Sequence, residues 1–330
     1  MNFKEEIVQL KKELDVTIVA HFYQKDEVFE MGDIVGDSLE LAKKSMVCES
    51  SNIIFCGVGF MGESVKVLAP QKRVFMPKIA CCAMAKMIDV DYFDMNLKIL
   101  NEAGISSDDI LPITYINSSA AVKAAVGKMG GYVCTSSNAF KIIQRGLESG
   151  KKIFFVPDRC LGQNFANQMD LKSAVVGIDD IEDVKASDII CFNGFCSVHQ
   201  LFTPEDVDFY KDKYPDIVVA VHPECDVEVV KKADFVGSTS QLIKYITEDL
   251  DENQKVVVGT EFNMVNRLRE KNTYVLSSTK PECSTMNETT LEDLYNTLIS
   301  IKNKTYENEI IVDKEVEKYA KIALNRMFEV

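Results

Sequence analysis

The stretch TIVAHFYQKDEVFEMGDIVGDSLELA, residues 17–42, contains the pattern on which the interpretation of the whole fold depends. It begins with a β-branched run, typical of a buried strand, and this run ends in the polar side chains of His21 and Tyr23. Further on, Ser38 stands directly before a helical pattern. The stretch therefore predicts a strand with a polar end, followed by a helix that has a serine at its start.

Similar apolar runs recur along the chain and alternate with helical patterns. They are NIIFCGV (52–58), ITYIN (113–117), KIFFVPD (152–158), DIVVAVH (216–222) and KVVVGTE (255–261). Such alternation is typical of parallel sheets that are covered by helices. The sequence therefore predicts a fold of the α/β class.

The order of these segments repeats three times, at intervals of roughly a hundred residues. In each third of the chain, a first strand ends in polar residues, a hydroxyl side chain precedes a helix, a third strand leads into a polar turn, and a fourth strand leads to a cysteine. The strand ends are His21 and Tyr23, Tyr115 and Asn117, and His222 and Glu224. The helix starts carry Ser38, Ser136, Ser238 and Thr239, and the cysteines are Cys82, Cys196 and Cys283.

This repeat predicts three similar three-layer α/β/α domains with short parallel sheets. Because ligands bind beyond the carboxyl ends of parallel strands, we expect the three domains to surround one central active site with pseudo-threefold symmetry. The expected units are 1–81, which includes an N-terminal helix and which the C-terminal tail could join, then 82–195 and 196–282. A C-terminal segment, 283–330, would carry the third cysteine and the closing helices.

Composition limits the possible partners and the location. The net charge of −14 argues against nucleic acid, which requires a basic surface. No window approaches 18 consecutive apolar residues, so we expect no membrane-spanning helix. The N-terminal MNFKEEIVQLKKELD is typical of an amphipathic helix rather than a signal peptide, which predicts a cytoplasmic protein.

The ten cysteines are expected to be reduced thiols, and no CxxC pair is present. Cys82, Cys196 and Cys283 occupy equivalent positions in the repeats, and three converging thiolates suit a soft metal centre. A [4Fe–4S] cluster usually takes four cysteines, so three would leave one iron open as a Lewis acid. Zinc bound by the same three cysteines is the competing interpretation. The spacing does not decide between Cys82 and its neighbour Cys81. We interpret the remaining cysteines as packing residues: Cys48, Cys56, Cys134, Cys160, Cys191 and Cys225.

The polar strand ends supply the acid–base candidates. We interpret His21 and His222 as hydrogen-bond donors or acids toward a substrate, and Tyr23 and Glu224 as the best proton-transfer groups. Because Tyr23 and Glu224 each follow a histidine by two residues, an extended strand would place both members of each pair on one face. His199 is interpreted as a residue that orients the loop of Cys196. The hydroxyl residues at the helix starts are predicted N-caps whose surroundings would also suit an anion.

The sequence resembles the quinolinate synthases from about residue 19 to residue 296. The stretches that carry the resemblance are AHFYQKDEV, VGDSLELAKK, FCGVGFMGES, CCAMAKM, TYINSSAAVKA, CTSSNA, GFCSVH, HPEC, GSTSQLI, GTEFNMVNRL and ECSTMNETTL. The resemblance implies three stacked α/β domains around an active site that condenses iminoaspartate with dihydroxyacetone phosphate in NAD biosynthesis. It also implies a functional link to an aspartate oxidase, which would supply iminoaspartate.

The resemblance further implies one [4Fe–4S] cluster per chain on Cys82, Cys196 and Cys283, since the family has glycine where Cys81 stands. The implied substrate contacts are His21, Ser38, Tyr115, Ile116, Asn117, Ser136, His222, Pro223, Glu224 and Thr239. Ile116 and Pro223 would act through their backbone groups. Two other functions compete with this one: a zinc-dependent lyase or hydrolase that uses the three cysteines, and a non-enzymatic iron–sulfur sensor or electron carrier.

Overall fold

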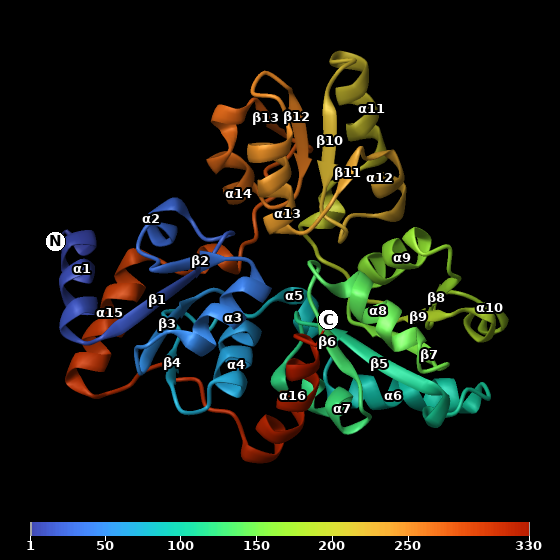
Figure 1. The fold of residues 1–330 in the computed structure, drawn as a ribbon, viewed down its shortest axis with the longest axis horizontal. Helices are drawn as coiled ribbons and strands as arrows, with labels where there is room; N and C mark the ends of the chain where they lie inside the picture. Colours follow the sequence, from blue (N-terminus) through green and yellow to red (C-terminus); the bar gives the residue numbers. More distant parts are fainter. Residues whose placement is uncertain (1, 330) are drawn as a thin grey trace.

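The computed structural model describes residues 2–329 and contains three parallel β-sheets, each flanked by helices (Figure 1). The first sheet has the strand order β2-β1-β3-β4, and the third has the equivalent order β11-β10-β12-β13. The middle sheet, β6-β5-β7-β9-β8, follows the same plan with β8 added at its edge. The predicted fold of three similar α/β/α domains is therefore confirmed.

The strands of the first unit are almost fully buried because helices lie on both faces of its sheet. Runs such as Ile53–Phe55 are typical of parallel strands covered on both sides. The elements of this unit are α1 (Phe3–Glu13), β1 (Val16–His21), α2 (Asp26–Phe29), β2 (Ile34–Gly36), α3 (Ser38–Val47), β3 (Asn52–Cys56), α4 (Gly59–Leu68) and β4 (Arg73–Phe75).

The middle unit contains the longest sheet and begins after Cys82. Its helices are α5 (Ala83–Lys86), α6 (Val90–Glu102), α7 (Ala120–Lys128), α8 (Ala139–Leu147), α9 (Arg159–Gln168) and α10 (Ile181–Ala186). Its strands are β5 (Ile110–Tyr115), β6 (Tyr132–Cys134), β7 (Lys152–Val156), β8 (Ser173–Val175) and β9 (Ile189–Cys191).

The third unit is followed by two long helices. Its elements are a 3-10 turn (His199–Leu201), α11 (Pro204–Lys213), β10 (Val218–Val221), α12 (Val227–Lys232), β11 (Phe235–Val236), α13 (Thr239–Lys244), β12 (Val256–Gly259), α14 (Phe262–Arg267) and β13 (Thr273–Val275). The closing helices are α15 (Leu291–Asn303) and α16 (Lys314–Arg326).

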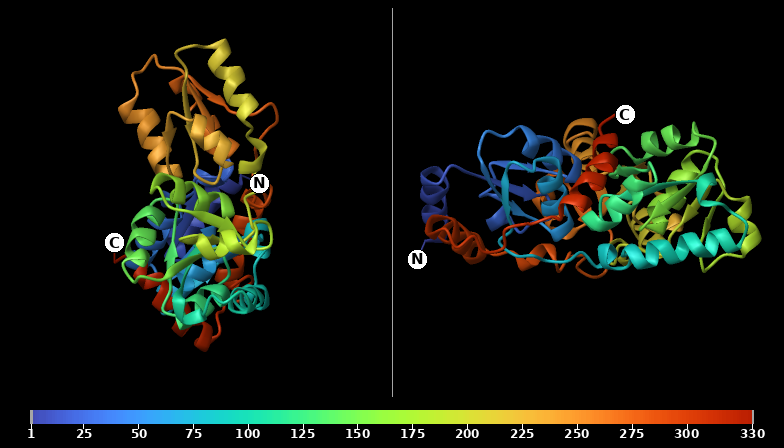
Figure 2. Two further views of the ribbon diagram at one scale, coloured as in Figure 1. Left: turned by 90° about the vertical axis from the view of Figure 1, so that its right-hand side faces the viewer. Right: turned by 90° about the horizontal axis from the view of Figure 1, so that it is seen from below.

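The closing helices return to the first two units. α15 packs against α1, where Leu294 and Leu298 join the apolar cluster of Ile7 and Leu10. α16 packs against α7 and α4 and so lies between the first and second units, as the view from below also shows (Figure 2, right). Because one continuous apolar core spans these two units, they are held together by hydrophobic packing.

The third unit has separate apolar clusters on the two faces of its sheet. Tyr23 is the residue of the first unit that packs against one of them. The predicted boundaries at 81/82, 195/196 and 282/283 fall in connections between elements, and we propose them as the boundaries of the units. Within residues 2–329, the structure contains no helix with the length and apolar character needed to cross a membrane.

Candidate active site

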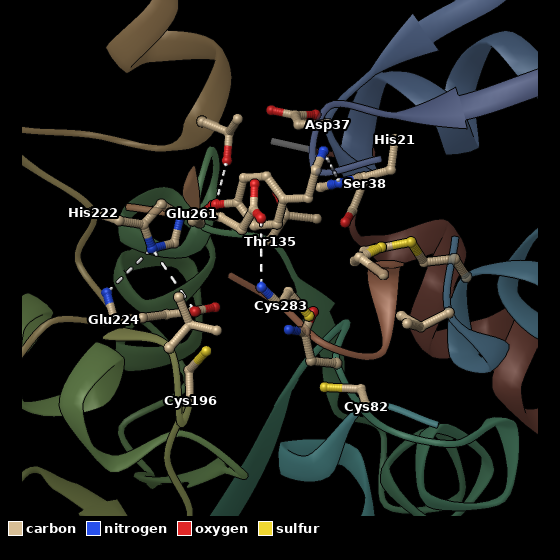
Figure 3. Close-up of a pocket in the computed structure, with 18 of the residues that line it drawn as sticks. His21, Asp37, Ser38, Cys82, Thr135, Cys196, His222, Glu224, Glu261 and Cys283 are labelled. Carbon is tan, nitrogen blue, oxygen red and sulfur yellow. Dashed lines mark hydrogen bonds and ion pairs between the residues drawn. The ribbon is translucent and has the colours of Figure 1, made fainter. Parts of the chain in front are cut away.

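The carboxyl ends of strands from all three sheets meet at one cavity (Figure 3). The predicted site residues that line the cavity are His21, Tyr23, Ser38, Cys82, Tyr115, Asn117, Ser136, Cys196, His222, Glu224, Thr239 and Cys283. The structure thus brings together residues that are up to about two hundred and sixty positions apart in the sequence.

His21 and His222 have the same local geometry in two different units. Nδ1 of His21 accepts a hydrogen bond from the backbone N–H of Tyr23 at 3.1 Å, and Nδ1 of His222 accepts one from Glu224 N–H at 3.3 Å. Burial lowers the pKa of His21 to about 4 and that of His222 to about 3, so both rings are neutral at pH 7. With Nδ1 as acceptor, the proton of each ring is on Nε2, which becomes a hydrogen-bond donor.

Tyr23 and Glu224 reach the cavity from turns and not from strands. β1 ends at His21 and β10 ends at Val221, so the expectation of one extended strand face is wrong. In the first unit, Gln24 N–H donates to His21 O at 3.0 Å and closes a turn directly after the strand. The equivalent turn in the third unit has the same geometry, which explains why the spacing of two residues still brings both side chains to the site.

A chain of close polar contacts links Tyr23 to Glu224 through two residues of the third unit. The Tyr23 hydroxyl lies 2.9 Å from Thr260 Oγ1, which lies 3.1 Å from His199 Nε2. On the other side of the ring, His199 Nδ1 lies 2.7 Å from Oε2 of Glu224. If His199 Nδ1 carries the proton toward the carboxylate, Nε2 accepts from Thr260, which in turn accepts from Tyr23. His199, interpreted from the sequence as a loop-orienting residue, thus connects two proposed proton-transfer groups.

Glu224 is buried but surrounded by groups that favour its ionised form. Burial alone would raise the pKa of its carboxyl, but His199, His222 and the Tyr115 hydroxyl together lower it below the usual range. Burial and the nearby Glu224 charge in turn raise the pKa values of Tyr23 and Tyr115 well above 10. At neutral pH the cavity therefore holds one carboxylate acceptor at Glu224 next to two protonated phenols.

Cys82, Cys196 and Cys283 all line this cavity, as predicted from the repeat (Figure 3). All three are partly buried, whereas the neighbouring Cys81 is exposed. Burial raises the pKa of Cys82 to about 12 and also raises the pKa values of Cys196 and Cys283, so the thiols are protonated unless a bound metal displaces the proton. The predicted packing cysteines Cys56, Cys134, Cys160, Cys191 and Cys225 are all buried, and Cys48 is partly buried.

The three thiols are spread around the cavity and do not converge on one point. Among residues 2–329, the set of three potential ligands whose donor atoms all lie within 4.8 Å of one another is Cys196, His199 and Glu224. Cys82 and Cys283 do not belong to it. Ligands of a single zinc ion lie about 4 Å apart, since Zn–S bonds are about 2.3 Å long. As placed in this structure, the three sulfur atoms are too far apart to bind one zinc ion together.

Comparison with known proteins identifies the family of this chain. Residues 5–329 match the family model described as "Quinolinate synthetase A protein". The chain belongs to the quinolinate synthetase A family. A protein named quinolinate synthase from Helicobacter pylori (strain HPAG1) is 54% identical over 99% of this chain and 98% of its own length. The proteins of that name from Alkaliphilus metalliredigens and Streptomyces coelicolor are 40% and 39% identical, over 100% and 94% of this chain and 98% and 84% of their own lengths. The expected family, and with it the expectation of an enzyme, is confirmed.

In this member of the quinolinate synthetase A family, the hydroxyl residues at the helix starts have different local roles. Ser238 caps α13, with its hydroxyl accepting from Gln241 N–H at 3.4 Å, and it does not line the cavity. The cap of α3 is Asp37 and not Ser38, so the predicted N-cap role of Ser38 is wrong. Likewise, Ser136 and Thr239 are not caps, since Asn138 precedes α8 and Thr239 is already within α13. Ser38, Ser136 and Thr239, which do not cap helices, all line the cavity.

Two further predicted contacts, Ile116 and Pro223, lie outside the cavity wall. The backbone N–H of Ile116 donates to Cys134 O at 2.8 Å, and its carbonyl accepts from Lys123 Nζ at 2.7 Å. The Pro223 carbonyl accepts from Asn164 Nδ2 at 2.9 Å. The backbone groups of Ile116 and the Pro223 carbonyl thus already form hydrogen bonds within the protein.

Sequence reasoning missed several polar residues of the site, among them Asp37 and Glu261, which line the cavity, and Thr260, which bonds to Tyr23 and His199. Glu261 is fully buried, lines the cavity and caps α14, and burial raises the pKa of its carboxyl to about 8. Its position after the third strand of its unit corresponds to that of Asp158, which caps α9 in the middle unit. Comparison of these two acidic caps within the repeat was the signal that could have identified Glu261.

Proposed function

We propose that this chain is a quinolinate synthase that condenses iminoaspartate with dihydroxyacetone phosphate to give quinolinate, phosphate and water. The observation that carries the proposal is that one cavity collects histidines, hydroxyls, a carboxylate and three cysteines from all three units. Family membership over almost the whole chain supports the same reaction. We also propose a cytoplasmic location and a functional link to the aspartate oxidase that would supply iminoaspartate.

The three cysteines are the proposed ligands of a [4Fe–4S] cluster. Their wide spacing around the cavity supports a cluster over a single zinc ion. When bound, the cluster would supply an open iron that acts as a Lewis acid in the loss of hydroxyl groups. The remaining chemistry is assigned to the side chains of the protein.

The carboxylates of iminoaspartate are proposed to bind among donors that carry no net charge. His21 and His222 present Nε2–H groups, because their Nδ1 atoms already accept backbone hydrogen bonds. Ser38, at the first turn of the ten-residue helix α3, adds a hydroxyl close to the positive end of the helix dipole. The proposed contacts Tyr115, Asn117, Ser136 and Thr239 complete the ring of polar groups in the cavity.

Tyr23 and Glu224 are proposed to move protons during condensation and ring closure. Glu224 is held ionised and can accept a proton, whereas Tyr23 is held protonated and can donate one. A proton accepted by Glu224 would return to Tyr23 through this chain if His199 took it at Nδ1 and gave the proton on its Nε2 to Thr260, so the transfer uses the tautomer protonated at Nε2. This connection supports a mechanism in which Tyr23 and Glu224 return to their starting protonation states and act again in a later proton transfer.

One specific observation favours a rival reading. The compact set of Cys196, His199 and Glu224 resembles a mononuclear zinc site, which would make the chain a zinc-dependent lyase or hydrolase. Against this reading, His199 Nδ1 and Glu224 Oε2 already lie 2.7 Å apart and contact each other directly. A sensor or electron carrier has less support, because the cavity offers space and polar groups for a reactant beside the cysteines.

The decisive experiment is anaerobic purification, followed by iron, sulfide and zinc analysis and an assay for quinolinate with both substrates. We expect about four irons and four sulfides per chain, as in a [4Fe–4S] cluster. Cys283→Ser should lose the cluster and the activity, whereas Cys81→Ser, at the exposed neighbour of Cys82, should keep both. One zinc per chain, or a fully active Cys283→Ser protein with its cluster intact, would contradict the proposal.

A further inference from the structure

Asp37 lies where the three units meet, and its carboxylate accepts four hydrogen bonds. Oδ1 accepts from the backbone N–H groups of Leu39 and Glu40, both at 3.0 Å, and so caps its own helix α3. Oδ2 accepts from the Ser137 hydroxyl of the second unit at 2.9 Å and from the Ser240 hydroxyl of the third unit at 2.7 Å. An ionised carboxylate has about four acceptor positions, so all of them are occupied.

Asp37 and the two hydroxyl residues that it binds are each adjacent in sequence to a hydroxyl residue of the cavity wall. Ser38 follows Asp37 itself, Ser136 precedes Ser137, and Thr239 precedes Ser240. We propose that Asp37 is a positioning residue that fixes these three hydroxyls, one from each unit, relative to one another and thereby sets the affinity for a dicarboxylate ligand. This inference rests on the proposed function, since it assumes that the three hydroxyls contact such a ligand.

The third unit requires polar contacts of this kind. Its apolar clusters are separate from the core shared by the first two units, so hydrophobic packing alone does not fix its position. Other polar contacts hold it elsewhere, such as the hydrogen bond from Arg267 Nη1 to Gln24 O at 3.0 Å. The bond between Ser240 and Asp37 lies directly beside the cavity hydroxyls of Ser38 and Thr239, and the Thr239 hydroxyl also lies 2.9 Å from that of Tyr23.

Asp37 can lie in a site for anions because its charge is already compensated. Two backbone N–H groups and two hydroxyls point at the carboxylate, and they orient their positive ends toward it. In Figure 3 the Asp37 side chain lies at the edge of the cavity next to Ser38. The same four bonds that neutralise Asp37 also align the wall on which a substrate carboxylate would rest.

Ser240 is the best position for a test, because it does not line the cavity itself. Its hydroxyl contacts Asp37 and, at 3.2 Å, Oε2 of Glu40, which lies on the same helix as the Asp37 cap. A change in ligand affinity on Ser240→Ala would therefore have to pass through the contact between the units. Ser240→Thr keeps the hydroxyl and serves as the rescue variant.

The experiment measures the affinity of the full-length, cluster-loaded protein for quinolinate by anaerobic titration calorimetry. The loss of one such hydrogen bond corresponds to about a fivefold weaker affinity, which we expect for Ser240→Ala, while Ser240→Thr should bind like the wild type. Asp37→Ser keeps a good capping residue but lacks the second acceptor, so it should bind more weakly than Ser240→Ala. Adding Ser240→Ala to Asp37→Ser should then change the affinity less than twofold.

The matched control is Asp313→Ser, because Asp313 caps α16 in the same way but bonds only to its own helix through Glu315 and Val316. The affinity of the Asp313→Ser protein for quinolinate should stay at the wild-type value. The inference is overturned if Ser240→Ala binds like the wild type, or if its effect is undiminished in Asp37→Ser. A wild-type protein that neither binds nor forms quinolinate would refute the proposed function instead, so the two failures are distinguishable.

Discussion

Replacement of Lys123 by methionine should change how the stability of this protein depends on pH. Lys123 lies on α7 with no exposed surface, and its Nζ donates to Ile116 O at 2.7 Å and to the Ser118 carbonyl. Its ammonium group also lies 5.4 Å from the centre of the Phe60 ring. Burial lowers the pKa of Lys123 from 10.5 to about 7, against an opposing effect of Glu63. Methionine has a similar length but neither charge nor hydrogen-bond donor.

The magnitude follows from this shift in pKa. Between the folded value of about 7 and the unfolded value of 10.5, the unfolded chain binds more protons at Lys123, so the stability rises as the pH rises. Each full pH unit in this window raises the free energy of unfolding by about 1.4 kcal/mol. Near pH 7 the increase is smaller, because Lys123 is still half protonated in the folded state. Between pH 7 and pH 9, the free energy of unfolding of the wild type should therefore rise by about 2 kcal/mol relative to that of Lys123→Met.

The assay is urea unfolding of both proteins under anaerobic conditions at several pH values, followed by circular dichroism. Comparing the two proteins cancels the titration of every other group. Lys128→Met is the matched control, since Lys128 lies on the same helix but is exposed, and its difference from the wild type should not follow this trend. A difference between wild type and Lys123→Met that stays constant within about 0.5 kcal/mol from pH 7 to pH 9 would refute the reasoning.

Two further predictions concern the proton path. Thr260→Val removes the hydroxyl between Tyr23 and His199 but keeps the shape of the side chain, so kcat should fall by about 10²-fold. Thr260→Ser keeps the hydroxyl and should keep the activity. A Thr260→Val enzyme with unchanged kcat would exclude the path. Glu224→Gln should keep its iron and sulfide but lose turnover by at least about 10²-fold, and measured turnover equal to that of the wild type would remove Glu224 from the acid–base role.

The fold was predictable because each unit repeats a pattern that parallel sheets require. Strands covered on both faces are continuous apolar runs, and β3 and β12 were located to within about two residues for this reason. The rule that ligands bind at the carboxyl ends of strands then placed the polar strand ends in one cavity. The cysteines followed from the repeat, because the loops after β4, β9 and β13 all point to the same place.

The contacts between units were not predictable, because no local pattern encodes them. Thr260 follows the apolar run of β12, and nothing nearby in the sequence indicates its bonds to Tyr23 and His199. The sequence around Asp37 predicts an ordinary helix cap. This accounts for the bonds of Oδ1 to its own helix but not for the bond that Oδ2 accepts from Ser240. Such residues act across distances of about two hundred positions, and only the packing of the units brings their partners within reach.

The cavity also shows why the net charge of a chain says little about the ligands it binds. The chain carries a net charge of −14, and within residues 2–329 the cavity wall includes neither lysine nor arginine. The donors that an anion would meet there are dipoles: the Nε2–H groups of His21 and His222 and the first turn of α3. Oriented dipoles fix the direction of each substrate oxygen, whereas a flexible lysine would attract any anion. For the proposed joining of two small anionic molecules in one orientation, such directional donors would serve better than a mobile cation.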